Sequence, residues 1–214
     1  MQLHAVLVPP PDVVEDALEA ARGLVQTTPD VVDEPRPGLV GRLLGRRQPA
    51  APAAPVVTTA LAAPEAVFVR LAKFGNVTAS DAAGLARALE AAAGTWRVPE
   101  VHVSRLAVAD APPLEVTAQL DGDVDALREI FRNVNEVARL ERFFLDRRNF
   151  RSELALGAVE VADGAPLPED VVGAELAHPG RRWSPTHVTL LRTSFTDSGT
   201  TFSEVARVQL AAQE

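Results

Sequence analysis

The chain has 214 residues, of which 47% are hydrophobic and 23% charged, so it is long enough to bury the core of one ordinary globular domain. Its formal net charge of -8 disfavours long-range attraction to a polyanion, and any nucleic-acid contact would need a local basic patch. The lack of cysteine excludes disulfides, thiol nucleophiles and thiolate metal sites.

The N-terminal part of the chain predicts a strand followed by a helix. Residues 3–8, LHAVLV, are typical of a strand, and three prolines separate them from a helix that we expect to begin near Asp12. The first residues include no basic region and soon become acidic, so we expect no secretory signal. We therefore expect a cytoplasmic protein that is not exported.

The composition changes over residues 28–64, which are rich in Pro, Ala, Thr and Val and show no lasting period. We predict an inserted loop or tether there. Its longest uncharged run, residues 48–64, contains four prolines and predicts no membrane-spanning helix. Within the tether, residues 36–47 place four arginines among leucines and glycines. This segment could bind a protein partner, an anionic surface or RNA.

Four elements are expected in the middle of the chain. Residues 66–75 alternate like a strand, and the helix after them would have Ser80 or Asp81 as its N-cap and Gly94 at its end. Residues 99–109 and 114–122 then predict an antiparallel pair of strands.

The last elements begin with the longest expected helix, residues 123–144. Residues 152–161 predict a further strand, and residues 186–195 and 200–210 predict a closing hairpin. Because the strands are spread along the chain and the helices stand singly between them, we expect an α+β fold with antiparallel sheets.

Four phrases of the sequence occur in an order that is informative: LHAVLVPPPDVVEDAL, FVRLAKFGNVTASDAAGLARAL, NFRSELALGAV and RRWSPTHVTLLRTSFTDSGTTFSEVARVQL. This order resembles the 2H phosphoesterase superfamily, in particular its 2'-5' RNA ligase-like, cyclic phosphodiesterase branch. The resemblance implies one domain over residues 1–214 with two lobes, each an antiparallel sheet with outer helices, around a central cleft.

The resemblance also implies where the two His-x-Thr motifs of that family should lie. The first aligns to Phe68 and Arg70, and the second to Glu153 and Ala155. In the family, one histidine accepts a proton, the other donates one, and the hydroxyls hold the phosphate. Phe68 cannot transfer a proton and Arg70 stays protonated, so we interpret the chain as a catalytically degenerate member that is not expected to be an enzyme.

We expect these four side chains to face the cleft, because residues two apart on a strand share a face. Arg70 and Glu153 are the candidate ligand-binding residues, for a nucleotide or an RNA-derived ligand. They could also pair with each other across the cleft, with Phe68 filling the volume left by Ala155. The leading hypothesis is therefore a module that binds a ligand or a protein partner.

Two alternatives remain. His187 and Thr189, in SPTHVTLL, spell the catalytic motif but fall on the expected closing strand. An active 2',3'-cyclic nucleotide or 2'-5' phosphodiesterase, or an RNA ligase, would use them with His4 or His102. The second alternative is a structural or assembly protein with a filled cleft. We expect no cofactor and no metal, because His102 lacks a second ligand at metal-site spacing.

Overall fold

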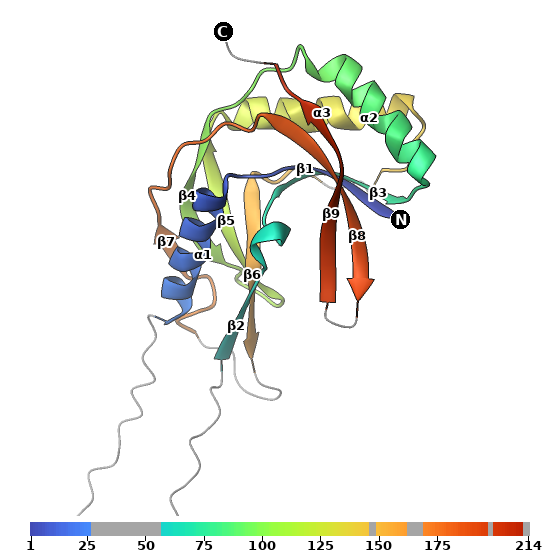
Figure 1. Cartoon of the computed structure of the whole chain (residues 1–214). Coiled ribbons are helices and arrows are strands. Elements are labelled where there is room, and N and C mark those ends of the chain that lie inside the picture. Colours follow the sequence, from blue (N-terminus) through green and yellow to red (C-terminus); the bar gives the residue numbers. More distant parts are fainter. Residues whose placement is uncertain (27–56, 146–148, 162–168, 197–198, 212–214) are drawn as a thin grey trace, which may run out of the picture.

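The computed structural model describes residues 1–26, 57–145, 149–161, 169–196 and 199–211 of the chain (Figure 1). Within these residues, two antiparallel sheets combine with three α-helices and one short 3-10 helix. The expected α+β class with two antiparallel sheets and outer helices is therefore confirmed. None of the helices in the described ranges has the length and hydropathy needed to cross a membrane.

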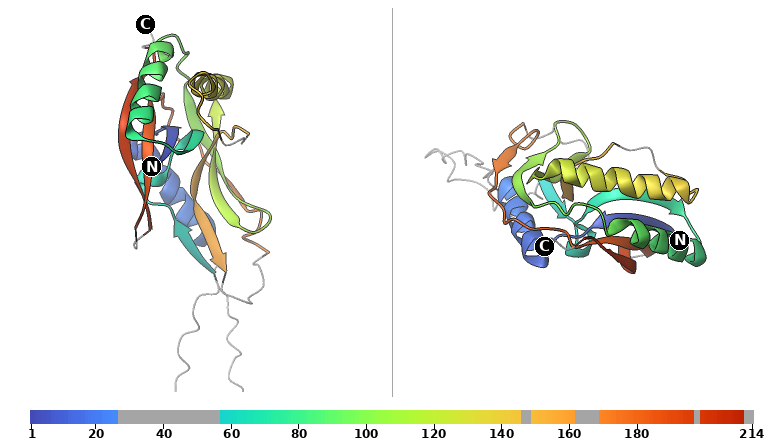
Figure 2. Two further views of the ribbon diagram at one scale, coloured as in Figure 1. Left: turned by 90° about the vertical axis from the view of Figure 1, so that its right-hand side faces the viewer. Right: turned by 90° about the horizontal axis from the view of Figure 1, so that it is seen from above.

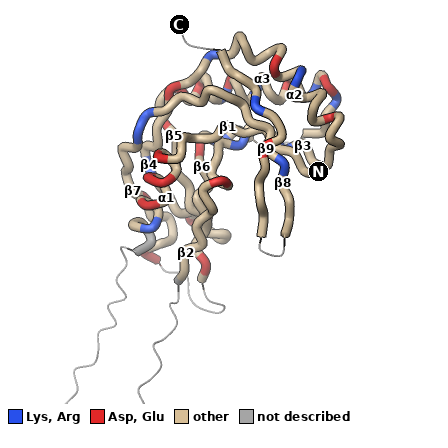
Figure 3. Tube along the Cα trace, viewed as in Figure 1, with Lys and Arg blue, Asp and Glu red and all other residues tan. Residues whose placement is uncertain are grey.

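Sheet A is the four-stranded sheet, with the strand order β3-β1-β8-β9. Its strands are β1 (Gln2–Leu7), β3 (Val69–Asn76), β8 (His187–Thr196) and β9 (Gly199–Gln209). The strands β8 and β9 form the expected closing hairpin, which projects beyond the rest of the sheet (Figure 1). The described residues of this hairpin that lie between Arg192 and Glu204 are all uncharged (Figure 3).

Sheet B is the five-stranded sheet, with the order β2-β6-β5-β4-β7. Its strands are β2 (Val57–Leu61), β4 (Val101–Val108), β5 (Leu114–Gly122), β6 (Glu153–Val161) and β7 (Glu175–Ala177). The predicted antiparallel pair is β4 and β5. A short 3-10 helix, η1 (Pro64–Ala66), connects β2 of sheet B to β3 of sheet A.

The strand β2 corrects the predicted tether over residues 28–64. Its pairs with β6 run from Val57 opposite Val161 to Leu61 opposite Gly157, so the end of the expected loop is part of sheet B. The sequence did not show this strand because it is short and ends a segment rich in Pro and Ala, although Val57, Thr58 and Thr59 are residue types that strands favour. Residues 28–56 lie outside the described residues, and the expected binding segment 36–47 lies among them.

The three α-helices are α1 (Pro11–Gln26), α2 (Ala79–Ala93) and α3 (Val124–Leu140). The helix α1 packs against β4 and β6 of sheet B, α2 packs against β9, and α3 packs against β3 and α2. Figure 2 shows α2 and α3 together at one end of the molecule. The helices therefore cover the sheets from outside, as the resemblance implied.

The N-terminus of α2 differs from the sequence prediction. Thr78, and not Ser80 or Asp81, is the N-cap, and it forms a reciprocal capping box with Asp81. The Asp81 amide donates to Thr78 Oγ1 at 3.1 Å, and Thr78 Oγ1 donates to Asp81 Oδ2 at 2.7 Å. The hydrogen bond from the Thr78 side chain lowers the pKa of Asp81, and the bond from the Thr78 amide adds to it. Gly94 is the C-cap, as expected.

Sheet A separates two apolar regions. Leu3, Ala5 and Leu7 of β1 lie in the main hydrophobic core, whereas the alternating residue Val6 belongs to a small second cluster. Val6, Phe68 and Leu191 are the buried members of this second cluster, and the partly buried Phe202 packs against them. The second cluster therefore lies on the sheet face that does not contact the main core.

Candidate ligand-binding cleft

A cleft of about 550 Å³ lies between β3 and β6, the strands that were expected to carry the two motifs. Phe68, Arg70, Glu153 and Ala155 all line it. The structure thus brings together two pairs of residues that are separated from each other by more than eighty positions in the sequence. The remaining lining includes Lys73 on β3, Glu115 on β5 and Phe131 on α3.

Strand alternation explains how these side chains reach the cleft. On β6, Leu154 and Leu156 are completely buried in the main core, so Glu153 and Ala155 point away from it. On β3, Val69 is buried in the same core, and Arg70 is exposed on the opposite face. The cleft is therefore lined by the non-core faces of both strands.

A β-bulge on β3 adds Lys73 to the cleft. In the ladder between β1 and β3, Ala5 lies opposite Ala72 and Val6 lies opposite Arg70, so Leu71 is the extra residue. Because of this extra residue, Arg70 and Lys73 share a face although they are three positions apart. Simple alternation could not predict Lys73 as a cleft residue, since the bulge leaves no clear mark in the sequence.

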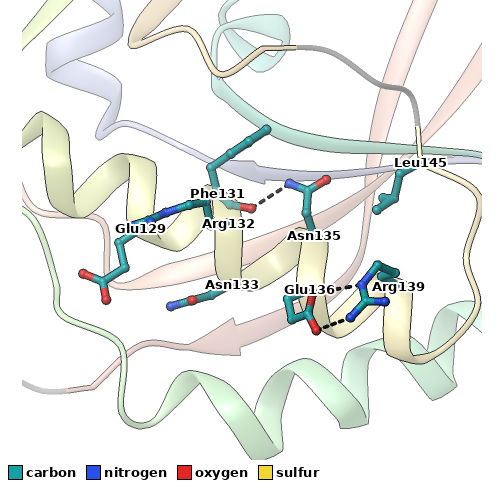
Figure 4. Close-up of a pocket in the computed structure, with 8 residues that line it drawn as sticks. All are labelled: Glu129, Phe131, Arg132, Asn133, Asn135, Glu136, Arg139 and Leu145. Carbon is teal, nitrogen blue, oxygen red and sulfur yellow. Dashed lines mark hydrogen bonds and ion pairs between the residues drawn. The ribbon is translucent and has the colours of Figure 1, made fainter.

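The helix α3 holds the bulged strand in place. Asn135 Nδ2 donates to the Leu71 carbonyl at 3.2 Å and to the Phe131 carbonyl at 2.6 Å. Figure 4 shows Asn135 beside Phe131 on α3, in a shallow depression that also contains the ion pair between Glu136 and Arg139. This ion pair lowers the pKa of Glu136 and raises that of Arg139, in both cases mainly through the hydrogen bond between them.

The two walls of the cleft differ in charge. Arg70 and Lys73 lie on the β3 wall, whereas the wall formed by β6, β5 and the segment before β6 carries Glu153, Glu115 and Arg151. Arg151 Nη1 donates to Glu153 Oε1 at 3.2 Å, and the Glu153 side chain is 22% exposed. The ion pair that the structure describes for Glu153 is thus with Arg151, and its pairing with Arg70 stays a prediction.

The ring of Phe68 packs against a neighbouring strand of its own sheet and does not reach across the cleft. Its ring meets that of Phe202 edge to face, with centroids 5.2 Å apart and an interplanar angle of 81°. Phe68 is 6% exposed, whereas Ala155 on the opposite wall is exposed. The expectation that Phe68 would fill the volume left by Ala155 is therefore wrong, because that volume stays open.

His187 and Thr189 lie on β8 and line a second pocket of about 420 Å³, with Glu65, Glu204 and Arg207. Their place on the closing strand agrees with the sequence analysis. The ring nitrogen Nδ1 of His187 lies 2.7 Å from Thr186 Oγ1. Among the described residues, His187 is the one imidazole that lines this pocket, and none lines the cleft between β3 and β6.

The histidines that could assist His187 lie elsewhere. Val6 pairs with Thr189 and His4 pairs with Leu191, so His4 and His187 are four positions apart along one ladder, or about 14 Å. His102 lies on β4 of sheet B. The two facing imidazoles that the enzymatic alternative needs are thus not assembled. Nor do the described residues bring together three His, Asp or Glu side chains that could hold a metal ion.

Comparisons with known proteins were made on sequence and on structure. No protein family model matches the sequence, and no curated protein matches it at a significant level. Escherichia coli LigT in complex with 3'-AMP is 16% identical and has a TM-score of 0.63, with 99% of this chain and 98% of that chain covered. A structure described as a phosphoesterase is 16% identical, with a TM-score of 0.61 and 99% of both chains covered.

Two further observations come from the same comparison. The protein TT0787 of Thermus thermophilus is 13% identical, with a TM-score of 0.59 and complete coverage of both chains. Other structures of Escherichia coli LigT contain NADP+, ATP or phosphate. At these identities the likeness concerns the fold, and it extends over the whole chain. The chain therefore has the two-sheet α+β fold of LigT-like 2H phosphoesterases.

Proposed function

We propose that this protein is a catalytically degenerate relative of LigT-like phosphoesterases that binds a small phosphate-bearing ligand in the cleft between β3 and β6. One observation carries the proposal. The four positions that resemble the two His-x-Thr motifs line one open cleft, and they supply Phe68, Arg70, Glu153 and Ala155 there.

The cleft lacks the groups for paired acid-base catalysis. Acid-base cleavage of a phosphate ester needs one group that accepts a proton from the attacking hydroxyl or water and an opposing group that donates a proton to the leaving oxygen. Glu153 could accept a proton, but Phe68 holds the opposing histidine position, and Arg70 stands at the threonine position and cannot act as the second acid-base group. Phe68 exchanges no proton, and Ala155 offers no hydroxyl to a phosphate oxygen.

The cleft retains what binding requires. Its volume of about 550 Å³ suits a small molecule. Arg70 and Lys73 supply positive charge, and the aromatic rings of Phe68 and Phe131 supply apolar surface. The similar fold of LigT, which has been solved with 3'-AMP, ATP and phosphate, supports a nucleotide as the class of ligand. The open cleft also favours binding over a purely structural role.

Calorimetric titration of the full chain with AMP and with inorganic phosphate tests the proposal. We expect Arg70→Gln to weaken AMP binding by about tenfold, because it removes a charge-assisted contact. Arg97→Gln is the matched control, since Arg97 is 66% exposed, pairs with Asp123 and does not line the cleft. The proposal fails if folded wild-type protein binds neither compound, or if both variants bind AMP as the wild type does.

A further inference from the structure

Lys73 reaches the cleft only because β3 departs from regular alternation. Leu71 is the extra residue of the bulge between β1 and β3. Without it, alternation from Arg70 would place Phe74 on the cleft face and turn Lys73 toward the main core. In the structure Phe74 is buried in that core, where its ring packs against Phe143, and Lys73 lines the cleft. The bulge therefore decides which side of sheet A receives this positive charge.

The bulge needs a hydrogen-bond donor from outside the sheet. The strand β3 is at an edge of sheet A, with β1 as its neighbour, and Leu71 has no partner in the ladder that the structure describes between them. Leu71 is buried, and a buried backbone carbonyl without a donor is costly. Asn135 supplies the donor, because its Nδ2 lies 3.2 Å from the Leu71 carbonyl oxygen.

The ammonium of Lys73 is open to a ligand. Arg151, the cation of the opposite wall, is engaged by Glu153 at 3.2 Å. Lys73 is partly buried in the cleft, and no ion pair of its ammonium is found within the described ranges. An ammonium group has three donors and attracts an anion as a compact point charge. The bulge thus brings to the cleft a cation whose donors a ligand can occupy.

Resting on the proposed function, we infer that Asn135 is a positioning residue of the cleft. By holding the bulge at Leu71 from α3, it keeps the ammonium of Lys73 on the β3 wall, where the anionic group of the ligand binds. Asn135 lines the shallow depression of Figure 4 and not the cleft, so it acts on the ligand through Lys73. Its second amide hydrogen is used by the carbonyl of Phe131, whose ring lines the cleft.

Lys73 is the one lysine of the chain, so an NMR label on its amine reports on this position directly. Reductive methylation with isotope-labelled formaldehyde keeps the charge, and the signal of Lys73 is the one that is absent in Lys73→Gln. We expect inorganic phosphate to shift this signal in the wild type. In Asn135→Ser, the hydroxyl can still bond to the Phe131 carbonyl one turn back, but it does not reach Leu71. The Lys73 signal of this variant should differ before phosphate is added and should no longer respond to phosphate.

A double-mutant cycle, measured by calorimetric titration with AMP, tests the link to binding. Lys73→Gln should weaken AMP binding about fivefold in the wild type and less than about twofold in Asn135→Ser, because Lys73 no longer faces the ligand there. A purely structural role of Asn135 would leave the effect of Lys73→Gln unchanged in any folded variant. Asn135→Gln keeps an amide donor, and the depression beside it has room for the longer side chain, so this variant should behave as the wild type does.

The matched control is Asn133→Ser, which makes the same change on another side of α3 and does not alter the cleft lining (Figure 4). It should retain the wild-type signal and the fivefold effect. A folded Asn135→Ser that retains both overturns the inference and leaves the proposed function intact, as does a folded Asn135→Gln that loses both. If folded wild-type protein binds neither AMP nor phosphate, the proposed function fails. The Lys73 signal without ligand then decides separately whether Asn135 positions the lysine, because an unchanged signal in Asn135→Ser overturns that as well.

Discussion

Phe68, at the position that the resemblance assigns to the first histidine, is a packing residue in this structure. A histidine at this position would present a proton-transfer group to the cleft. Phe68 instead packs with Val6, Leu191 and Phe202 in a small apolar cluster on the cleft side of sheet A. The strand keeps its place while the side chain serves the packing of its own sheet.

Arg142 is a second residue with an unusual role, at the end of α3. Its φ is 62°, in the left-handed region that glycine adopts most easily. The Phe143 amide donates to the Ala138 carbonyl at 2.9 Å, and the Arg142 amide donates to the Arg139 carbonyl at 3.0 Å. This is the Schellman arrangement, with arginine at the position where glycine is usual.

We predict that Arg142→Gly raises the free energy of unfolding by about 1 kcal/mol, because glycine removes the steric cost of the left-handed conformation. Urea denaturation measures the change. The control is Glu129→Gly, at an exposed position inside α3, which should lower stability by about 1 kcal/mol. A loss of stability in Arg142→Gly would contradict the assigned helix end.

At the scale of elements, the docking of β2 on β6 depends on Gly157. Its φ is +144°, and a Cβ placed on it would lie 2.2 Å from the Ala60 carbonyl oxygen and 2.8 Å from the Leu61 Cα. Both atoms belong to the backbone of β2, so they cannot move aside without displacing the strand. Only a residue without a side chain allows this close approach.

We predict that Gly157→Ala lowers the free energy of unfolding by about 2 to 3 kcal/mol and releases β2 from the sheet. Urea denaturation measures the first effect, and faster proteolysis within residues 57–61 measures the second. Gly84→Ala in α2 is the matched control, because nothing lies within 4 Å of its added Cβ. That variant should be more stable by about 1 kcal/mol. Unchanged proteolysis in Gly157→Ala would show that β2 does not need this contact.

The elements differ in how far the sequence could predict them. The strands and helices with a clear period, such as β5, β6 and α3, were expected at nearly the observed places. The strand β2 was missed because it is short and is stabilised by pairing with β6, and the bulge at Leu71 was missed because pairing with β1 creates it. Lys73 was therefore absent from the expected cleft residues.

At the scale of the whole molecule, the cleft results from the way two sheets are joined. Sheet A ends at β3, and η1 connects this strand to β2, which pairs with β6 on the other side of the cleft. Alternation along β3 and β6 predicted which side chains face the cleft. It could not predict that Glu153 would meet Arg151, since this depends on the path of the chain before β6.

Hydrolysis of 2',3'-cyclic AMP by the folded wild-type protein tests the central claim most directly. The reference is the fourfold variant Phe68→His, Arg70→Thr, Glu153→His and Ala155→Thr, which restores both His-x-Thr motifs at the cleft. His187→Ala, measured alongside, reports on the alternative site on β8. We predict no turnover by the wild type and measurable turnover by the fourfold variant, because only the latter places two imidazoles on facing walls. Wild-type turnover that disappears in His187→Ala would contradict the account and move the active site to β8.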